Sequence, residues 1–476
     1  MPDRFVLAVD QGTSATKCLL VDRHGAVVRT AGAPVPIRYP APGHVEQDAQ
    51  EILDSVLLAA ARCLDGIDPA TIAAVGLSTQ RESAVVWDRR TGRPAGPVLG
   101  WQDRRAHTVC DELREKGHGD RVRAVSGLPL DPMFSAAKLR RLLDHAPDSA
   151  AGTVDAWLLY ALTGAHRSEL GNASRTQLLD VATGRWSPEL LDLFGIAASA
   201  LPELVPSVGD LGTIGAAGGV LAGLPITAVL GDSHAALYAH GPRAAEGVKV
   251  TYGTGSSVMR LTGDGVLDPR VCRTIAWAAP GIRHAAEGNI RSSGATVAWL
   301  AALLGIDADR VAGLAAGATS DGVHLVPAFG GLAAPWWDDT AAGTITGLTL
   351  GTGGPQLARA AVESIAHQVA DVVDAMDAPG HLLADGGAAA NDHLMQIQAD
   401  LTGVPVKRAR TANLSALGAA HLAGRVAGLW SGTGPPACVT YDDFTPRDDT
   451  GATAARRAWH EAVRRALTPS EGADPA

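Results

Sequence analysis

Paired cysteines are missing from the chain. The five cysteines, residues 18, 63, 110, 272 and 438, are odd in number, widely scattered and without any Cys-x-x-Cys spacing. This pattern argues against a disulfide framework and against structural zinc. Reduced thiols in the cytoplasm are therefore expected.

Runs of basic residues and long apolar runs are also missing. The chain has 40 Lys and Arg against 50 Asp and Glu, so a basic surface that binds nucleic acid is not expected. No window of 18 residues is apolar and free of charge, and no basic segment with an apolar stretch precedes Phe5. We expect a soluble, unexported protein without membrane insertion.

The length and the alternation of elements indicate two α/β domains. A chain of 476 residues is too long for one core. Apolar and β-branched runs predict strands over residues 72–78, 226–230 and 248–252, and helical periodicity predicts helices over 156–162 and 355–376. The breaker-rich segment 240–247 places the boundary between domains 1–243 and 244–476.

Three short segments each put small, flexible residues directly after an apolar run. They are DQGT at 10–13, TYGTG at 251–255 and DGGA at 385–388. Any one of them alone is more often an ordinary turn. Three in one chain favour loops that bind the phosphates of a nucleotide.

The first of these loops has the chemistry of a phosphate and metal site. Residues 5–9 predict a strand that Asp10 ends, and residues 18–22 predict its hairpin partner. Gly12 allows a turn that directs N–H groups at an anion, and Thr13 and Ser14 add hydroxyl donors. The Asp10 carboxylate suits hydrated Mg²⁺, and Lys17 adds a positive charge.

Asp232 follows the predicted strand 226–230. Its position fits two roles equally well, the N-cap of a following helix or a catalytic residue. Ser233 could serve as the cap instead. His234 is a possible second base, although a lone His in a first helical turn is usually structural.

Together these and further segments resemble the FGGY family of carbohydrate kinases, most closely its glycerol kinase branch. The similarity runs from about Phe5 to Trp459. It includes, besides the three loops, YPAPGHVEQD (39–48), STQRES (78–83), WQDRR (101–105), GNASRT (171–176), PAFGGLAAPWWD (327–338) and ALGAAHLAG (416–424). Arg141 stands where the first family signature usually has Trp.

The resemblance implies a two-domain actin-like ATPase fold, with ribonuclease-H-like cores and ATP and sugar in the cleft between them. It implies Asp232 as the catalytic base and Asp10 as the Mg²⁺ residue. It implies that Arg81, Glu82 and Trp101 bind the acceptor, whereas by position alone Arg81 and Glu82 would be a solvated pair. The residues implied for the nucleotide and its phosphates are Gly12, Thr13, Ser14, Lys17, Thr254, Gly255, Gly294, Gly387 and Asn391.

Three acceptor positions depart from the glycerol kinase pattern. Met133 replaces a Tyr, Ser233 a Gln and Ser257 a Phe. Loss of a phenol, an amide and an aromatic wall should weaken the binding of glycerol. We therefore expect a four- or five-carbon polyol or ketose as substrate. A true glycerol kinase is the alternative, since flexible Met133 could simply fill the Tyr space.

Several properties stay open at this level. Actin-like folds also serve as sugar sensors without catalysis, but such a sensor has no need of Asp232 beside Arg81, Glu82 and Trp101. A homodimer or homotetramer is possible, and the sequence does not choose between them. Residues 218–225 lack the Arg that the resemblance requires for control by a sugar bisphosphate. Trp336 and Trp337 are expected at the domain interface.

Overall fold

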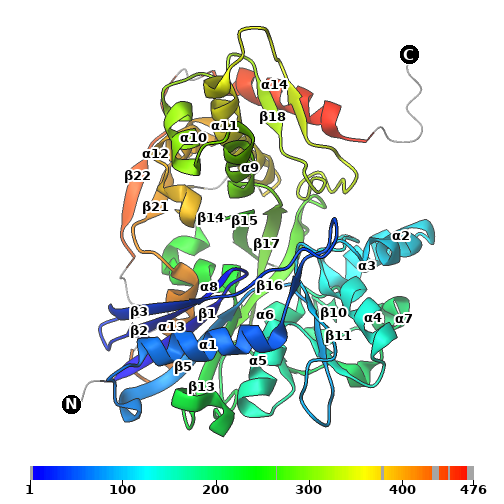
Figure 1. Cartoon of the computed structure of the whole chain (residues 1–476), viewed down its shortest axis with the longest axis vertical. Coiled ribbons are helices and arrows are strands. Elements are labelled where there is room, and N and C mark those ends of the chain that lie inside the picture. Colours follow the sequence, from blue (N-terminus) through cyan, green and yellow to red (C-terminus); the bar gives the residue numbers. More distant parts are fainter. Residues whose placement is uncertain (1–3, 264, 377–379, 431–438, 449–450, 469–476) are drawn as a thin grey trace.

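The computed structural model describes residues 4–263, 265–376, 380–430, 439–448 and 451–468, and the chain forms two α/β parts stacked on each other (Figure 1). The α/β class and each predicted strand and helix are confirmed. β14, for example, spans Val248–Tyr252 as predicted, and the long helix α11 spans Gly354–Asp374.

The first part is built on a five-stranded sheet with the order β13-β5-β1-β2-β3. β1 pairs with β2 in antiparallel fashion and with β5 in parallel, and β5 pairs with β13 in parallel. The strands are β1 (Phe5–Gln11), β2 (Ala15–Val21), β3 (Val27–Pro34), β5 (Ile72–Thr79) and β13 (Ile226–Gly231).

The second part repeats this arrangement in a seven-stranded sheet with the order β16-β17-β15-β14-β20-β21-β22. Its first strand, β14, again pairs antiparallel with the next strand, β15, and parallel with a later one, β20. The remaining strands are β15 (Ser256–Thr262), β16 (Cys272–Ala278), β17 (Ile282–Ile290), β20 (Leu382–Asp385), β21 (Val406–Ala409) and β22 (Tyr441–Phe444).

Fourteen α-helices within the described residues surround these sheets. They are α1 (Ala49–Cys63), α2 (His107–Glu115), α3 (Gly119–Ser126), α4 (Ser135–His145), α5 (Val154–Thr163), α6 (Leu170–Ala173), α7 (Pro188–Phe194), α8 (Asp232–Ala239), α9 (Gly294–Leu304), α10 (Ala308–Ala316), α11, α12 (Asp392–Thr402), α13 (Leu414–Val426) and α14 (Ala452–Ala466). Short strand pairs complete the fold: β4 (Glu46–Gln47) with β7 (Val98–Leu99), β6 (Val85–Trp87) with β8 (Ala150–Gly152), β9 (Arg167–Glu169) with β12 (Glu203–Val205), β10 (Leu179–Asp180) with β11 (Arg185–Trp186), and β18 (His324–Val326) with β19 (Thr344–Thr346).

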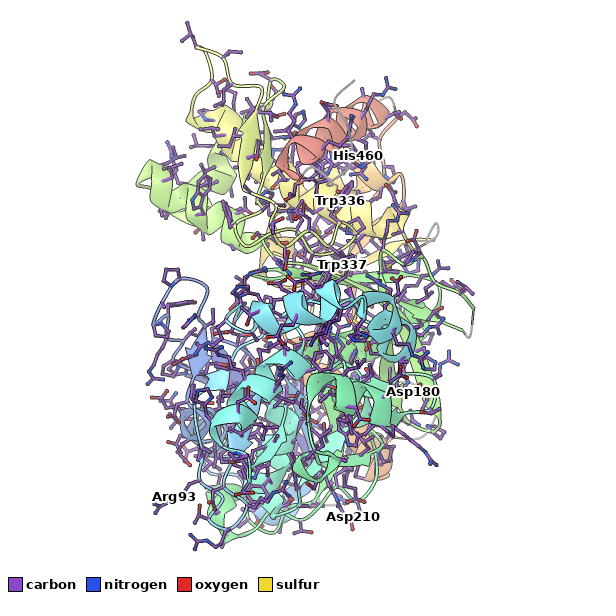
Figure 2. The ribbon with its side chains drawn as sticks, turned by 90° about the vertical axis from the view of Figure 1, so that its right-hand side faces the viewer. Arg93, Asp180, Asp210, Trp336, Trp337 and His460 are labelled. Atoms are coloured by element: carbon purple, nitrogen blue, oxygen red, sulfur yellow. The ribbon has the colours of Figure 1, made fainter. Side chains whose placement is uncertain are left out.

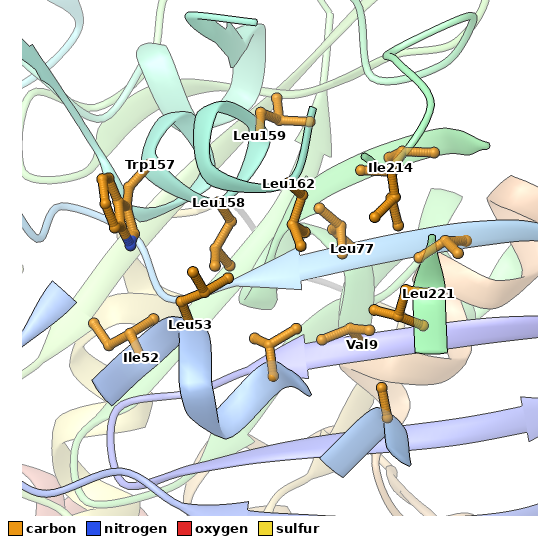
Figure 3. Close-up of a cluster of buried hydrophobic side chains, with 14 of the residues drawn as sticks. Val9, Ile52, Leu53, Leu77, Trp157, Leu158, Leu159, Leu162, Ile214 and Leu221 are labelled. Atoms are coloured by element: carbon orange, nitrogen blue, oxygen red, sulfur yellow. The ribbon is translucent and has the colours of Figure 1, made fainter. Parts of the chain in front are cut away.

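The alternation of side chains along β1 explains why its sheet is covered on both faces. Leu7 and Val9 point to one face, where they belong to a buried cluster with Leu77, Ile52 of α1 and Trp157 of α5 (Figure 3). Val6 and Ala8 point to the other face, against residues of α8 and α13. Because β1 is buried on both faces, its sequence is a continuous apolar run, and this run is what predicted the strand.

Helix α13 belongs to the second half of the chain but packs on the sheet of the first half. Two glycines permit this contact. A Cβ on Gly76 of β5 would lie 2.4 Å from the Ala419 carbonyl oxygen, and a Cβ on Gly418 would lie 1.9 Å from the Ala235 carbonyl oxygen. Close backbone approach therefore joins the two parts at this point.

Some local predictions are corrected. Asp10 does not end its strand, because β1 continues to Gln11, and the hairpin partner begins at Ala15. Trp336 and Trp337 lie in different surroundings (Figure 2). Trp337 lies with its ring 6.4 Å from that of Phe134 in the first part, whereas Trp336 lies 6.0 Å from His460 of α14.

Cys18, Cys63, Cys110 and Cys272 are buried free thiols, and Cys438 lies outside the described residues. None of the helices in the described part of the chain combines the length and apolar character needed to cross a bilayer.

Candidate active site

The site lies where parallel strands end. In the first sheet Gln11 pairs with Thr79 and Thr79 with Gly231, so the turns after β1, β5 and β13 meet at one edge. In the second sheet Thr251 of β14 pairs with Asp385 of β20 in the same way. Loops at the carboxyl ends of strands are the usual place for ligands in α/β sheets.

A cavity of about 340 Å³, here called the inner cavity, opens at this edge. It is lined by residues from both halves of the chain, and eleven of the residues predicted from sequence are among them. These are Thr13, Ser14, Arg81, Glu82, Trp101, Met133, Asp232, Ser233, Thr254, Gly255 and Ser257.

A second cavity of about 610 Å³, here called the loop cavity, adjoins it. Asp10, Lys17 and Gly387 line it, as predicted residues, together with Asp385. Thr251 lines both cavities, so a group bound in one would lie next to a group bound in the other.

Asp232 is the first residue of α8 and is partly accessible, with 38% of its side chain exposed. Neither Asp232 nor Ser233 is the N-cap, because that position is Gly231, which has no side chain to cap the helix. The Asp232 Oδ1 atom accepts hydrogen bonds from the Ser233 N–H at 2.6 Å and from Arg81 Nε at 3.2 Å. The carboxylate is held at the cavity wall, where it can accept a proton from a bound hydroxyl.

Arg81 and Glu82 are not a solvated pair, because both are buried in a network of charges. Arg81 donates to both carboxylate oxygens of Glu287, at 2.9 and 2.7 Å. Arg175 donates to Glu82 at 2.6 Å and lies 3.1 Å from Glu287. Burial alone would raise the pKa of Glu287, but Arg175 and Arg81 outweigh it and hold this pKa well below its usual value.

His234 lies within this network and does not have the properties of a second base. It is buried, and its Nε2 lies 3.2 Å from Arg81 Nη1. Burial and the neighbouring Arg81 charge hold its pKa well below the ordinary value of 6.5. His234 is therefore neutral and structural.

Hydrogen bonds hold several residues of the inner cavity in place. Trp101 Nε1 donates to Thr13 Oγ1 at 3.1 Å, which links Trp101 to the first glycine loop. Ser257 Oγ donates to Glu287 at 3.2 Å. Met133 is anchored through its backbone, because its N–H donates to Asp131 at 2.8 Å and its carbonyl accepts from Lys138 at 2.5 Å.

Asp10 is partly buried, lines the loop cavity and accepts a hydrogen bond from Ser78 Oγ at 2.7 Å. Burial raises its pKa to about 6; the Ser78 hydrogen bond opposes this rise and the charge of Asp232 adds to it. Lys17 reaches across to the second half of the chain, where its Nζ donates to Asn413 at 2.9 Å.

The second and third glycine loops pack against each other. Gly386 has a φ of +92°, and a Cβ there would lie 2.5 Å from the Tyr252 carbonyl oxygen. A Cβ on Gly255 would lie 2.4 Å from the Ile290 carbonyl oxygen. Both positions require glycine, because a side chain there would overlap the backbone of the neighbouring segment.

Three predicted residues lie behind the cavity walls. The Gly12 N–H closes its own turn by donating to Ala15 at 3.0 Å. Gly294 begins α9 and donates to the Gly253 carbonyl at 2.9 Å. Asn391 caps α12, with its side-chain oxygen accepting from the N–H groups of His393 and Leu394. Each of the three shapes a loop or a helix start near the cavities.

Sequence reasoning missed Glu287, Asn289 and Arg175 as parts of the site. Asn289 lines the inner cavity and accepts from Arg175 at 2.8 Å. Arg175 stands within the GNASRT segment, which was a usable signal. Glu287 sits in the middle of β17, 206 residues from Arg81, and no local pattern marks it.

Two α/β parts with glycine-rich turns on either side of a cavity that holds a carboxylate fit a phosphotransferase acting on an alcohol group. The chain belongs to the FGGY family of carbohydrate kinases: the N-terminal domain of that family matches residues 5–239 and its C-terminal domain matches residues 248–427. It is therefore an ATP-dependent carbohydrate kinase.

Individual relatives support this family membership. A glycerol kinase of Alkalilimnicola ehrlichii is 43% identical over 97% of this chain and 98% of its own length. Among solved structures, Plasmodium falciparum glycerol kinase with ADP has a TM-score of 0.84 at 26% identity, and covers 98% of both chains. Xylulose kinase from Rhodospirillum rubrum has a TM-score of 0.83 at 26% identity, with 97% of this chain and 98% of that chain covered. The two-domain kinase fold is thus confirmed.

Proposed function

We propose that this kinase phosphorylates a hydroxyl of a four- or five-carbon polyol or ketose. The observation that carries the proposal is the set of side chains on the inner cavity: a thioether at Met133 and two short hydroxyl side chains at Ser233 and Ser257. A cavity of about 340 Å³ falls within the range of roughly 300–1,000 Å³ of ordinary ligand pockets. A three-carbon polyol would leave part of it to water.

Asp232 acts as the base in this proposal. It would take the proton of the attacking hydroxyl, while Arg81 keeps the carboxylate oriented through the 3.2 Å hydrogen bond. Trp101 would pack on the carbon chain. Thr13 and Ser14 line the inner cavity from the first half of the chain and the loop 253–255 lines it from the second half, so they would hold the transferred phosphate in line with the hydroxyl.

We propose residues 1–243 as the part that binds acceptor and phosphate, and 244–476 as the part that binds nucleotide. Supporting this, the glycines of the third loop line the loop cavity together with residues 408–415. The buried free thiols fit a reducing compartment, and we propose a cytoplasmic location.

The residues of the loop cavity fit Mg²⁺ as a partner of the nucleotide. Asp10 and Asp385 both line the cavity, and the buried Asp385 Oδ2 has no hydrogen-bond partner among the described residues. No group of three or more His, Cys, Asp or Glu in those residues could hold a metal by itself. That suits Mg²⁺, which uses one or two carboxylates besides water and phosphate oxygens and neutralises charge on the transferred group.

The test is a coupled ATP assay over glycerol, erythritol, threitol, ribitol, arabitol, xylitol and the matching ketoses, with ATP turnover without acceptor as the baseline. The proposal expects a kcat/KM at least about tenfold higher for one four- or five-carbon acceptor than for glycerol. A preference for glycerol over every longer acceptor contradicts it.

Glycerol kinase activity is the second candidate. It is favoured by the 43% identical relative of that name and by the presence of Arg81, Glu82, Trp101 and Asp232 on the inner cavity. The same panel decides between the two.

A further inference from the structure

A third cavity of about 230 Å³, here called the side cavity, shares part of its lining with the inner cavity. Four residues line both cavities and form the boundary between them: Trp101, Gln102, Met133 and Arg291. Met133 is unbranched and flexible at this boundary, so its thioether can shift without a change of backbone. A shift of Met133 would open a route from the inner cavity into the side cavity for a chain of carbons that lies beside Trp101.

The walls of the side cavity carry hydrogen-bonding groups fixed by the protein. Arg291 forms an ion pair with Asp131 and donates to the Gly330 carbonyl. Arg104 donates to the same carbonyl at 2.8 Å. A guanidinium carries five N–H donors, and the two contacts of Arg291 leave others for a ligand.

The charges around the side cavity cancel. Arg104 and Arg291 are matched by Asp131, which pairs with Arg291, and by Asp339, which lies 3.5 Å from Arg104. Asp103 also lines the cavity and is neutralised by Arg105 at 2.8 Å. A balanced set of donors and acceptors suits a neutral hydroxylated chain better than a carboxylate or a phosphate.

We propose that the side cavity is a distal subsite that receives the hydroxyl-bearing carbons of the acceptor beyond the third, with Arg291 and Gln102 as donors. This deepens the proposed function and rests on it. The base and the reacting hydroxyl stay at Asp232, and the side cavity selects for chain length at the other end of the acceptor.

Two independent changes test the subsite. Arg291→Met removes the donors, and it is made together with Asp131→Asn so that no buried carboxylate is left unpaired; the Asn oxygen can still accept from the Met133 N–H. Ala295→Leu fills the side cavity from α9. Its matched control is Ala298→Leu, the same change at an exposed position of the same helix.

The readout is kcat/KM for glycerol and for the best longer acceptor of the wild type. Both site variants should lower the value for the longer acceptor about tenfold or more relative to the value for glycerol, while Ala298→Leu leaves both unchanged. If both variants lower all acceptors equally, the subsite is wrong while the proposed function stands.

Two outcomes in the wild type also decide. A preference for glycerol overturns the proposed function itself. A preference for a sugar acid over the neutral polyol of equal length, lost on Arg291→Met, overturns the neutral chain as occupant.

Discussion

The inner cavity and the loop cavity are built by different means. Side chains that charge pairs hold in place form much of the inner cavity, with Glu287 joining Arg81 to Arg175. Close backbone approaches shape the glycine loop of the loop cavity, as at Gly386 against Tyr252. A site made of side chains can change its ligand by substitution, whereas a site made of backbone keeps its ligand. If, as proposed, the inner cavity holds the acceptor and the loop cavity holds the nucleotide, the kinase can change acceptor without changing nucleotide.

The largest effect should come from the base. Asp232→Asn keeps the shape of the side chain but cannot take a proton, so kcat should fall by about a hundredfold to ten-thousandfold with nucleotide binding nearly unchanged. Steady-state kinetics and calorimetric titration of ATP measure the two effects. Near wild-type turnover with the best acceptor would show that Asp232 is not the base.

The next largest effect should be on stability, at Glu287. Glu287→Gln leaves Arg81 and Arg175 buried without their shared carboxylate, and removal of one partner of a buried pair costs about 3–5 kcal/mol. Denaturant unfolding measures the loss. The matched control is Glu51→Gln, which breaks the exposed pair with Arg38 and should leave the midpoint almost unchanged.

The pH dependence of the same residue adds a check. Because the folded-state pKa of Glu287 lies below its usual value, its contribution to stability is complete above the unfolded pKa and is lost as the pH falls through the folded one. Wild type should therefore lose stability in acid more steeply than Glu287→Gln. Parallel acid transitions would contradict this role.

A smaller, uniform effect should come from Asp10 in the loop cavity. Its pKa is raised from 3.8 to about 6, so the group is protonated below pH 6 and cannot serve the metal. The wild-type kcat/KM should fall up to about tenfold per pH unit below that value, and Asp10→Ala should lower kcat and raise the Mg²⁺ requirement for all acceptors alike. A change confined to the KM of one polyol would contradict this role.

For folding the sign is opposite. A carboxyl group whose pKa is raised by burial binds its proton more tightly in the folded state, so Asp10 begins to destabilise the fold as the pH rises above its unfolded pKa, and this cost is complete above the folded pKa of about 6. Asp10→Asn should then raise stability at neutral pH while it lowers activity. A gain in stability together with a loss of activity would show that Asp10 is a functional carboxylate and not a structural one.

How far the sequence predicts this site depends on whether its signals are local. The strand Val248–Tyr252 and the loop after it are found because β-branched residues stop at Gly253. Asp10 is found for the same reason, although β1 runs one residue past it. The partners of Arg81 are not found, since Glu287 is an isolated acid in a buried strand of the other half. Burial of that pair is a property of the assembled fold.

The smallest effect should be a shift of acceptor preference in the inner cavity. The triple change Met133→Tyr, Ser233→Gln and Ser257→Phe restores a phenol, an amide and an aromatic wall, which would exclude longer chains and bond a short one in the transition state. Each regained contact contributes about 1 kcal/mol, so the ratio of kcat/KM for glycerol to that for a five-carbon acceptor should rise about tenfold or more. The KM for ATP, which depends on the loop cavity, should stay constant and serves as the internal control. An unchanged ratio would mean that these three side chains do not select the acceptor, and a shifted KM for ATP would show that the two cavities are not independent.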